Sequence, residues 1–145
     1  MAARVRLPEA MSEIVLFDSS VLIDQMRTNR HLERILGVNG LVRNSSVVLA
    51  ELWRGASSAV DRQMVLALEK NHPVLTPTET NWLESGRILG KIHTEKGYEP
   101  KQLRELHFDV LIALTARSHG ARLITSNRVD FELIREYRDF RLDVW

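Results

Sequence analysis

Short apolar runs alternate along the chain with longer segments in which apolar residues recur at helical spacing. The runs that fit strands span residues 14–17, 41–43, 74–75, 122–125 and, with the two-residue alternation of an edge strand, 140–144. Helical spacing covers residues 19–26, 32–36, 46–55, 59–70, 78–96, 101–106 and 108–119. Strands separated by helices predict right-handed βαβ units and a mostly parallel sheet. The predicted fold class is therefore α/β, a three-layer α/β/α domain.

Four carboxylates stand out because each lies in or beside an apolar segment. Asp18 directly follows the first strand, and Asp130 lies in the turn after the fourth strand. Asp109 is predicted at the start of the helix 108–119, and Glu51 lies inside the third helix. Sites in parallel sheets lie beyond the carboxyl ends of the strands, so we expect these acids to gather there.

Carboxylates gathered in this way need a compensating charge. Two carboxylates about 5 Å apart repel each other by roughly 3 kcal/mol at an effective dielectric constant near ~20. Sites built only from oxygen ligands favour the hard cations Mg²⁺ and Mn²⁺, which keep waters for substrate phosphates. Such ions activate water for in-line attack at phosphorus. The pattern is therefore typical of metal-dependent phosphoryl chemistry.

Each acid also has an ordinary structural interpretation. Asp18 can cap the first helix, Glu51 can be a solvated helix residue, and Asp109 can complement a helix dipole. Asp130 follows Asn127 by three residues, which is the spacing of a helix cap with an acid in the first turn. The observation that favours a common site is the arrangement of all four acids within one α/β plan.

At these acids the sequence resembles the PIN-domain family, and within it the VapC-type toxins of bacteria and archaea. The matching stretches, one around each acid, are FDSSVLID, SSVVLAEL, FDVLIALTA and LITSNRVDF. They occur in the family's order and at similar spacing, and they span residues 14–131. Each motif alone is weak evidence, whereas four in order are specific.

The resemblance implies a PIN domain over residues 14–145 with a five-stranded, mostly parallel sheet, preceded by an N-terminal extension at residues 1–13. It also implies a Mg²⁺- or Mn²⁺-dependent endoribonuclease, the toxin of a type II toxin–antitoxin pair. Such a toxin forms a homodimer and is inhibited by a small antitoxin encoded alongside. The expected reaction is hydrolysis of RNA by in-line attack of water, which leaves 5′-phosphate ends.

Carried over residue by residue, the resemblance makes Asp18 and Asp109 the metal ligands, and Glu51 and Asp130 the other catalytic members of the pocket. The polar positions expected to support the pocket by hydrogen bonds are Ser20, Thr125 and Asn127. Asn127 is expected to orient Asp18 or a water. The sequence departs from the family at His107, two residues before Asp109, where relatives often carry Asn or a small polar residue.

Basic and aromatic residues extend the expected RNA contacts. Arg54 and Arg128 are the candidate RNA-binding residues, because they adjoin proposed site residues and phosphate contacts supply most of the affinity for RNA. Trp53 and Trp82 can stack on bases, although we favour core or dimer packing for both. For His107, which can contact phosphate, we favour a plain surface position.

Composition narrows the possible settings of the protein. A chain of 145 residues without cysteine fits one domain, excludes thiolate chemistry and is compatible with the cytoplasm. No apolar run reaches the roughly 20 residues of a membrane span, and the N-terminus lacks the apolar stretch of a secretory signal. The 20 basic residues balance 19 acidic ones, so gathering four acids into a pocket leaves the remaining surface more basic.

Two other functions stay open on the sequence alone. One is a PIN nuclease with a housekeeping role in RNA processing, and the other is a PIN domain that binds a cation or a partner without cleaving RNA. A phosphatase with an aspartyl nucleophile is disfavoured, because the expected Asp-x-Asp after the first strand reads Asp18-Ser19-Ser20.

Overall fold

The computed structural model describes residues 13–145, so the predicted N-terminal extension lies outside the described residues except for Glu13. The strands are β1 (Ile14–Phe17), β2 (Leu41–Ser45), β3 (Val74–Leu75), β4 (Arg122–Thr125) and β5 (Arg141–Val144). The helices are α2 (Ser19–Thr28), α3 (Leu32–Leu36), α4 (Ser46–Gly55), α5 (Ala59–Asn71), α6 (Glu79–Lys96), α7 (Pro100–Ser118) and α8 (Arg128–Tyr137). The five predicted strands are confirmed, with shifts of one or two residues at their ends.

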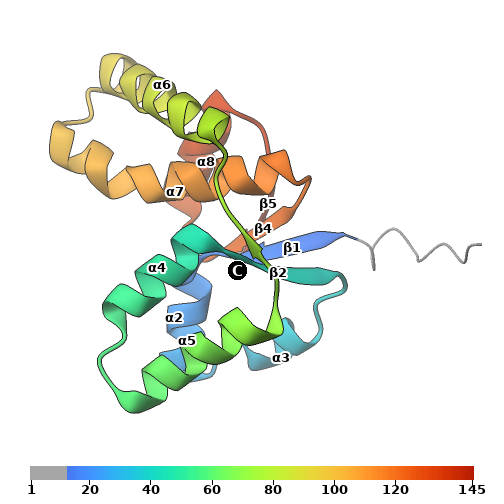
Figure 1. The fold of residues 1–145 in the computed structure, drawn as a ribbon. Coiled ribbons are helices and arrows are strands. Elements are labelled where there is room, and N and C mark those ends of the chain that lie inside the picture. Colours follow the sequence, from blue (N-terminus) through green and yellow to red (C-terminus); the bar gives the residue numbers. More distant parts are fainter. Residues whose placement is uncertain (1–12) are drawn as a thin grey trace, which may run out of the picture.

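The strands form one parallel sheet in the order β3-β2-β1-β4-β5. The chain proceeds from the central β1 to one edge and then returns to build the other edge. Because parallel crossovers are right-handed, these two directions place helices on opposite faces of the sheet. Figure 1 shows α2–α5 on one side of the strands and α6–α8 on the other. The three-layer α/β/α architecture is confirmed, and its switch of direction lies between β1 and β4.

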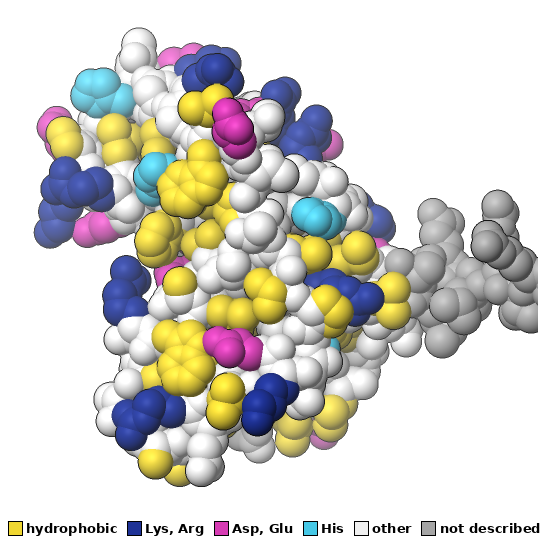
Figure 2. All heavy atoms as spheres, in the orientation of Figure 1, with side chains coloured by type: hydrophobic (Ala, Val, Ile, Leu, Met, Phe, Trp, Pro, Cys, Tyr) yellow, Lys and Arg dark blue, Asp and Glu magenta, His cyan; other side chains and the backbone are white. Residues whose placement is uncertain are grey.

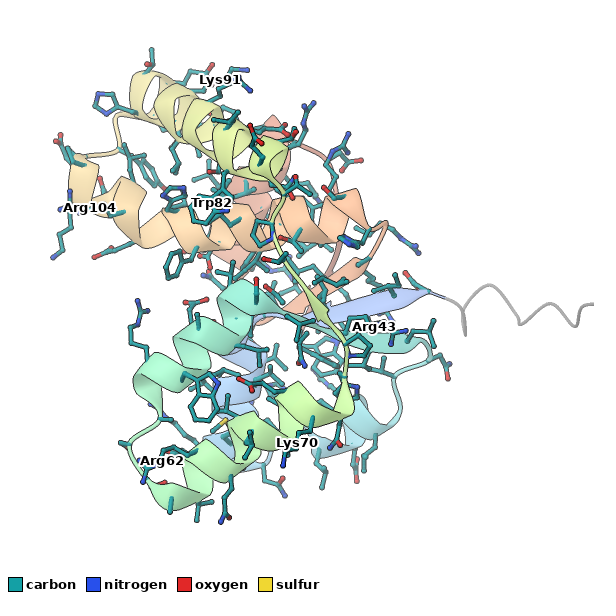
Figure 3. The ribbon with its side chains drawn as sticks, viewed as in Figure 1. Arg43, Arg62, Lys70, Trp82, Lys91 and Arg104 are labelled. Carbon is teal, nitrogen blue, oxygen red and sulfur yellow. The ribbon has the colours of Figure 1, made fainter. Side chains whose placement is uncertain are left out.

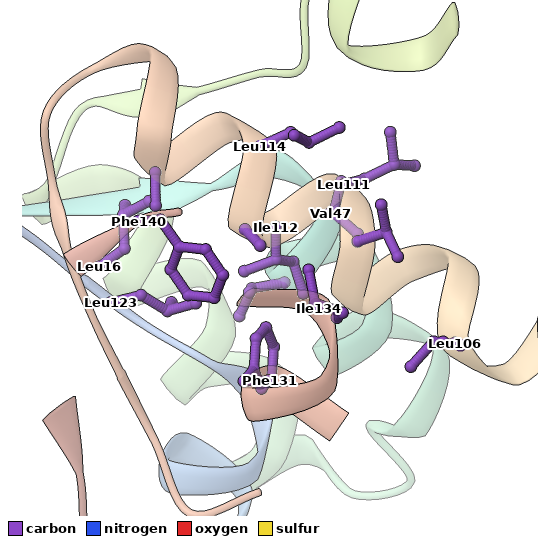
Figure 4. Packing of buried hydrophobic residues seen from close by; sticks show 14 of the residues in the cluster. Leu16, Val47, Leu106, Leu111, Ile112, Leu114, Leu123, Phe131, Ile134 and Phe140 are labelled. Carbon is purple, nitrogen blue, oxygen red and sulfur yellow. The ribbon is translucent and has the colours of Figure 1, made fainter. Parts of the chain in front are cut away.

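Alternation along the strands supplies the core on both faces. Leu16 and Leu123 face the larger apolar cluster, which contains Phe131 and Phe140 with their ring centroids 6.4 Å apart (Figure 4). Val15, Phe17 and Ile124 face the second cluster, beneath α2 and α3. Burying one such side chain contributes about 1.5–3 kcal/mol. Both faces therefore hold the carboxyl ends of β1 and β4 in fixed positions.

Helix α7 differs from the sequence prediction. Two helices were expected, at 101–106 and 108–119, but one helix runs without a break from Pro100 to Ser118. Pro100 occupies the first turn, where its missing N–H is not needed, and the Gln102 side chain accepts a hydrogen bond from the Glu99 N–H at 2.8 Å. No glycine or proline interrupts the segment, so packing against α6 and α8 can join the turns. Asp109 consequently lies in the middle of a helix rather than at a helix start.

Within residues 13–145, no helix combines the length and apolar character needed to cross a membrane.

Candidate active site

Asp18 lies at the switch of direction, between the ends of β1 and β4. Its backbone N–H donates to the carbonyl of Ile124 at 2.8 Å, which joins the two strand ends. Its Oδ2 accepts hydrogen bonds from Ser20 Oγ at 2.7 Å and Thr125 Oγ1 at 2.9 Å. The other oxygen, Oδ1, is buried and has no hydrogen-bond partner. Although Asp18 holds the capping position of α2, its side chain makes no capping hydrogen bond, so capping does not account for this acid.

The two hydroxyls that hold Asp18 are themselves fixed by the backbone. Ser20 Oγ accepts a hydrogen bond from the Ser126 N–H at 3.1 Å, and Thr125 Oγ1 accepts one from the Asn127 N–H at 2.9 Å. Each hydroxyl therefore accepts a hydrogen bond from a backbone N–H and donates its own proton to the Asp18 carboxylate. This arrangement orients one oxygen of Asp18 and leaves the other free.

Asn127 supports a different acid from the one expected. Its side chain caps α8 by accepting from the Asp130 N–H at 3.3 Å, and its Nδ2 donates to Asp130 Oδ2 at 2.9 Å. The expected contact between the Asn127 side chain and Asp18 is absent among the described hydrogen bonds. The reason is the helix start at Arg128, which turns the amide toward the first turn of α8. Asn127 reaches Asp18 only through its backbone N–H and Thr125.

Asp109 approaches the cluster from α7, on the opposite face of the sheet from α4. The pKa of Asp109 is raised to about 8, principally by burial and then by the charges of Asp18, Asp130 and Glu51. A side-chain hydrogen bond to Asp130 acts in the same direction, because it requires a proton between the two carboxyl groups. The three other predicted acids thus lie within electrostatic reach of Asp109.

Glu51 completes the cluster from α4. Burial first, and then the charge of Asp18, raise the pKa of Glu51, while Arg54 and a hydrogen bond from Ser19 lower it. The Ser19 Oγ donates to Glu51 Oε1 at 3.4 Å. Glu51 is half-buried and opens to a surface groove, so it can contact both the other acids and solvent.

The donors available suit a divalent cation held by few protein ligands. Among residues 13–145, no three His, Cys, Asp or Glu side chains converge as a ready ligand set. Mg²⁺, however, commonly uses one or two carboxylates and completes its coordination with water. The unpartnered Asp18 Oδ1 and the Asp109 carboxyl fit that requirement, because a cation would offset the burial and the neighbouring acids that raise the pKa of Asp109.

The two candidate RNA-binding arginines lie outside the acid cluster. Arg54 projects from α4 with its guanidinium over the ring of Phe108, 5.7 Å from the ring centroid. Arg128 is exposed and pairs with Glu132 at 3.1 Å, one turn along α8. Phe108 was not identified from the sequence, because an aromatic residue in an apolar helical segment is normally expected to pack in the core.

The two candidate tryptophans and His107 make contacts within the protein. The Trp53 indole N–H donates to Glu69, and Trp82 contacts His107 edge-on at 5.9 Å between centroids. His107 is half-buried, hydrogen-bonds to Ser85 at 2.9 Å, and has a pKa lowered by burial. Trp53 packs against the core as we favoured, whereas Trp82 is half exposed and core packing is not shown for it. His107 is not the plain surface residue that we favoured.

The fold and the cluster define an α/β domain with four carboxylates at its topological switch point. A model of the PIN domain family matches residues 15–136, and the chain belongs to that family. Comparison with curated protein sequences gives no match.

Solved structures that share this fold include three toxin–antitoxin proteins or complexes. VapBC-1 from nontypeable Haemophilus influenzae has a TM-score of 0.70 at 26% identity, over 91% of this chain and 98% of that chain. VapBC2 from Rickettsia felis, bound to a DNA fragment from their promoter, has a TM-score of 0.68 at 20% identity, with the same coverage. A toxin–antitoxin complex from Klebsiella pneumoniae has a TM-score of 0.57 at 22% identity, over 81% of this chain and 89% of that chain. The resemblance found in the sequence is thereby confirmed.

Proposed function

We propose that this protein is an endoribonuclease that depends on Mg²⁺ or Mn²⁺ and acts as the toxin of a type II toxin–antitoxin pair. The observation that carries the proposal is the buried, unpartnered Oδ1 of Asp18 among three further carboxylates. A buried charge without compensation is costly, so a site of this kind is maintained for a ligand. Membership of the PIN family and likeness to VapBC complexes support nuclease chemistry and the toxin role.

In this proposal Asp18 and Asp109 hold the metal ion. When bound, the ion polarises a water and neutralises charge on the phosphodiester. Ser20 and Thr125 keep Asp18 Oδ2 occupied, so that Oδ1 stays directed into the site. Glu51 faces the groove and accepts the proton of the attacking water. Water attacks phosphorus in line, the P–O3′ bond breaks, and the leaving 3′-oxygen takes a proton from solvent, so the products carry 5′-phosphate and 3′-hydroxyl ends.

Cleavage of cellular RNA tests the proposal. The purified protein, free of antitoxin, should yield discrete fragments with 5′-phosphate ends in Mg²⁺ or Mn²⁺ and none in EDTA. Asp109→Asn should lower the cleavage rate by about 100-fold or more, because it removes a charged ligand from the site. Asp139→Asn, which neutralises an exposed acid outside the cluster, is the matched control and should cleave normally. Intact RNA, or 2′,3′-cyclic phosphate ends, contradicts the mechanism.

Metal binding has a readout that is independent of activity. Mg²⁺ or Mn²⁺ should raise the melting temperature of the protein, because an ion that binds only the folded state stabilises it by mass action. Asp18→Asn should abolish this increase and Asp139→Asn should preserve it. An equal increase in all three proteins would place the bound metal elsewhere.

The proposed partners are RNA, a small antitoxin and a second copy of the chain. For the antitoxin, the structure offers a mainly apolar groove of about 290 Å³ between α2, α3 and α5. Its lining includes the exposed side chains of Leu32 and Met64. Grooves of this kind accept the apolar face of an amphipathic helix. Met64→Glu should weaken co-purification with the product of a short neighbouring gene, whereas Gln63→Glu, on the same helix but outside that lining, should not.

A further inference from the structure

A polar groove leads from the acid cluster to the outer surface between α4 and α7. Its volume is about 530 Å³, and it is lined by Glu51, Arg54, Lys101, Arg104, Glu105 and Phe108. Glu51 belongs to both the groove and the cluster, and Phe108 immediately precedes Asp109. A molecule lying in the groove therefore contacts one member of the acid cluster, Glu51. Figure 2 shows a notch at the left edge of the molecule, with basic side chains above and below it.

The residues from α7 form a stripe along one face of that helix. Lys101, Arg104 and Phe108 follow each other at intervals of three and four residues, so they point in similar directions. The two cations are exposed at the outer end of the helix, where Figure 3 shows Arg104. Phe108 is half-buried and lies at the inner end, beside the acids. The stripe thus changes from cationic to aromatic as it approaches the cluster.

Arg54 faces this stripe from α4. Its guanidinium lies 5.7 Å from the centroid of the Phe108 ring, which is the geometry of a cation–π contact. Aromatic rings and guanidinium planes are the two protein surfaces on which unpaired nucleobases stack. The pair is only partly covered, and no other aromatic side chain lines the groove in the part of the chain that the structure describes.

We propose that Phe108 and Arg54 form a stacking site for one unpaired nucleobase, and that Lys101 and Arg104 bind the adjoining phosphates of the same strand. This inference rests on the proposed ribonuclease function and adds the path and the form of its substrate. The base faces of a duplex are hidden by stacking, so the site selects single-stranded RNA. Because Phe108 and Glu51 line the same groove, the stacked base fixes which phosphodiester lies over the acids.

Binding of a short single-stranded RNA in EDTA, followed by fluorescence anisotropy, tests the stacking site without cleavage. Phe108→Leu should weaken binding about tenfold, which corresponds to about 1.4 kcal/mol. Phe108→Tyr keeps an aromatic face and should bind within about twofold of the wild type. Trp82→Leu is the matched control, because it removes a half-exposed aromatic residue that packs on His107 outside the groove.

A series of RNAs, each with one abasic position, separates stacking from a general loss of structure. At one position the missing base should weaken wild-type binding about tenfold, and Phe108→Leu should then have no additional effect. Equal effects of Phe108→Leu on intact RNA and on every abasic RNA would overturn the proposal, as would wild-type affinity of the variant. A duplex of the same sequence should bind without dependence on Phe108.

Salt dependence tests the phosphate contacts. Arg104→Gln should reduce the slope of the logarithm of affinity against the logarithm of salt by about 0.7, the value for one lost phosphate contact on a single strand. Arg62→Gln, an exposed arginine on α5 (Figure 3), should leave the slope unchanged. Equal slopes for both variants would exclude Arg104 from the path.

The two proposals fail in different ways. If the wild type cleaves RNA in Mg²⁺ but binds independently of Phe108, the stacking site is wrong and the nuclease stands. If binding depends on Phe108 but RNA stays intact in Mg²⁺, the nuclease proposal is wrong and the groove still binds single strands.

Discussion

Asp18 holds its two carboxylate oxygens in opposite situations. Oδ2 accepts two hydroxyl hydrogen bonds, while Oδ1 is buried without a partner. A side chain whose orientation is fixed at one oxygen presents the other at a defined position, which is what a metal ligand requires. Asp109 differs, because its surroundings favour a proton in the absence of a cation. Of the two proposed ligands, Asp18 therefore has a fixed orientation, whereas the charge of Asp109 depends on whether a cation is bound.

The raised pKa of Asp109 predicts how stability changes with pH in EDTA. The ordinary pKa of this group is 3.8 and its value in the folded protein is about 8. Between these values the folded state retains a proton that the unfolded state has released, so the free energy of unfolding falls as pH rises from about 4 to about 8. Asp109→Asn is isosteric and removes this dependence.

Thermal unfolding of the wild type and Asp109→Asn from pH 4 to pH 8 measures the effect. The variant should become progressively more stable than the wild type, by about 1 kcal/mol or more at pH 8, or roughly 3 °C in melting temperature. Asp139→Asn should show no such divergence. A constant difference between wild type and Asp109→Asn across this range would refute the role of Asp109 in the pH dependence.

At the level of single residues, the sequence identified the acids of the site but not the orientations of the side chains around them. Asp18 and Asp109 were recognisable because charges embedded in apolar runs are unusual. The spacing of Asn127 and Asp130 indicated a helix cap, but it did not show that this contact turns the amide away from Asp18. Phe108 was missed for a similar reason, since apolar periodicity cannot tell a residue that lines a groove from one that packs in the core.

Helix boundaries show which local signals are reliable. Thr78 and Ser45 precede helices that the sequence predicted, and each side chain accepts a hydrogen bond in the first turn of its helix. These caps act within one turn, so the sequence contains the whole interaction. The continuity of α7 is different, because it depends on packing against α6 and α8, which brings Leu106 and Val110 into the core. That packing joins a segment that sequence alone divided near His107.

A proline placed at the predicted break distinguishes one helix from two. His107→Pro removes a backbone N–H in the interior of α7 and should lower the free energy of unfolding by about 3 kcal/mol more than His107→Ala does. Both variants lose the hydrogen bond to Ser85, so the difference reports the backbone alone. Urea denaturation measures it. Equal stability of the two variants would show that the helix ends at this position.

Across the whole molecule, the acids come from both sides of the sheet. Glu51 belongs to α4 on one face, while Asp109 and Asp130 belong to α7 and α8 on the other, and Asp18 lies at the strand ends between them. The cluster exists only while both helical layers are packed on the same strands. Folding and site assembly are therefore the same event.

This arrangement predicts a single cooperative unfolding transition. Trp53 on α4 and Trp82 on α6 report on opposite faces of the sheet. In variants that keep only one of the two, with Trp145 replaced by Phe in both, the urea midpoints should agree within about 0.2 M, as two-state unfolding requires. The far-ultraviolet circular dichroism midpoint should coincide with them. Separate midpoints would mean that one layer holds its structure without the other.

The hydrogen bond between Thr125 and Asp18 joins residues 107 positions apart in the sequence. On the ribosome, Asp18 therefore emerges long before the hydroxyl that orients it has been synthesised. At about 5–20 residues per second, that interval lasts roughly 5–20 seconds. In the proposed function, a nascent chain without Thr125 lacks the oriented Asp18, so we expect that it does not cut its own messenger and that inhibition becomes necessary only once translation has passed β4.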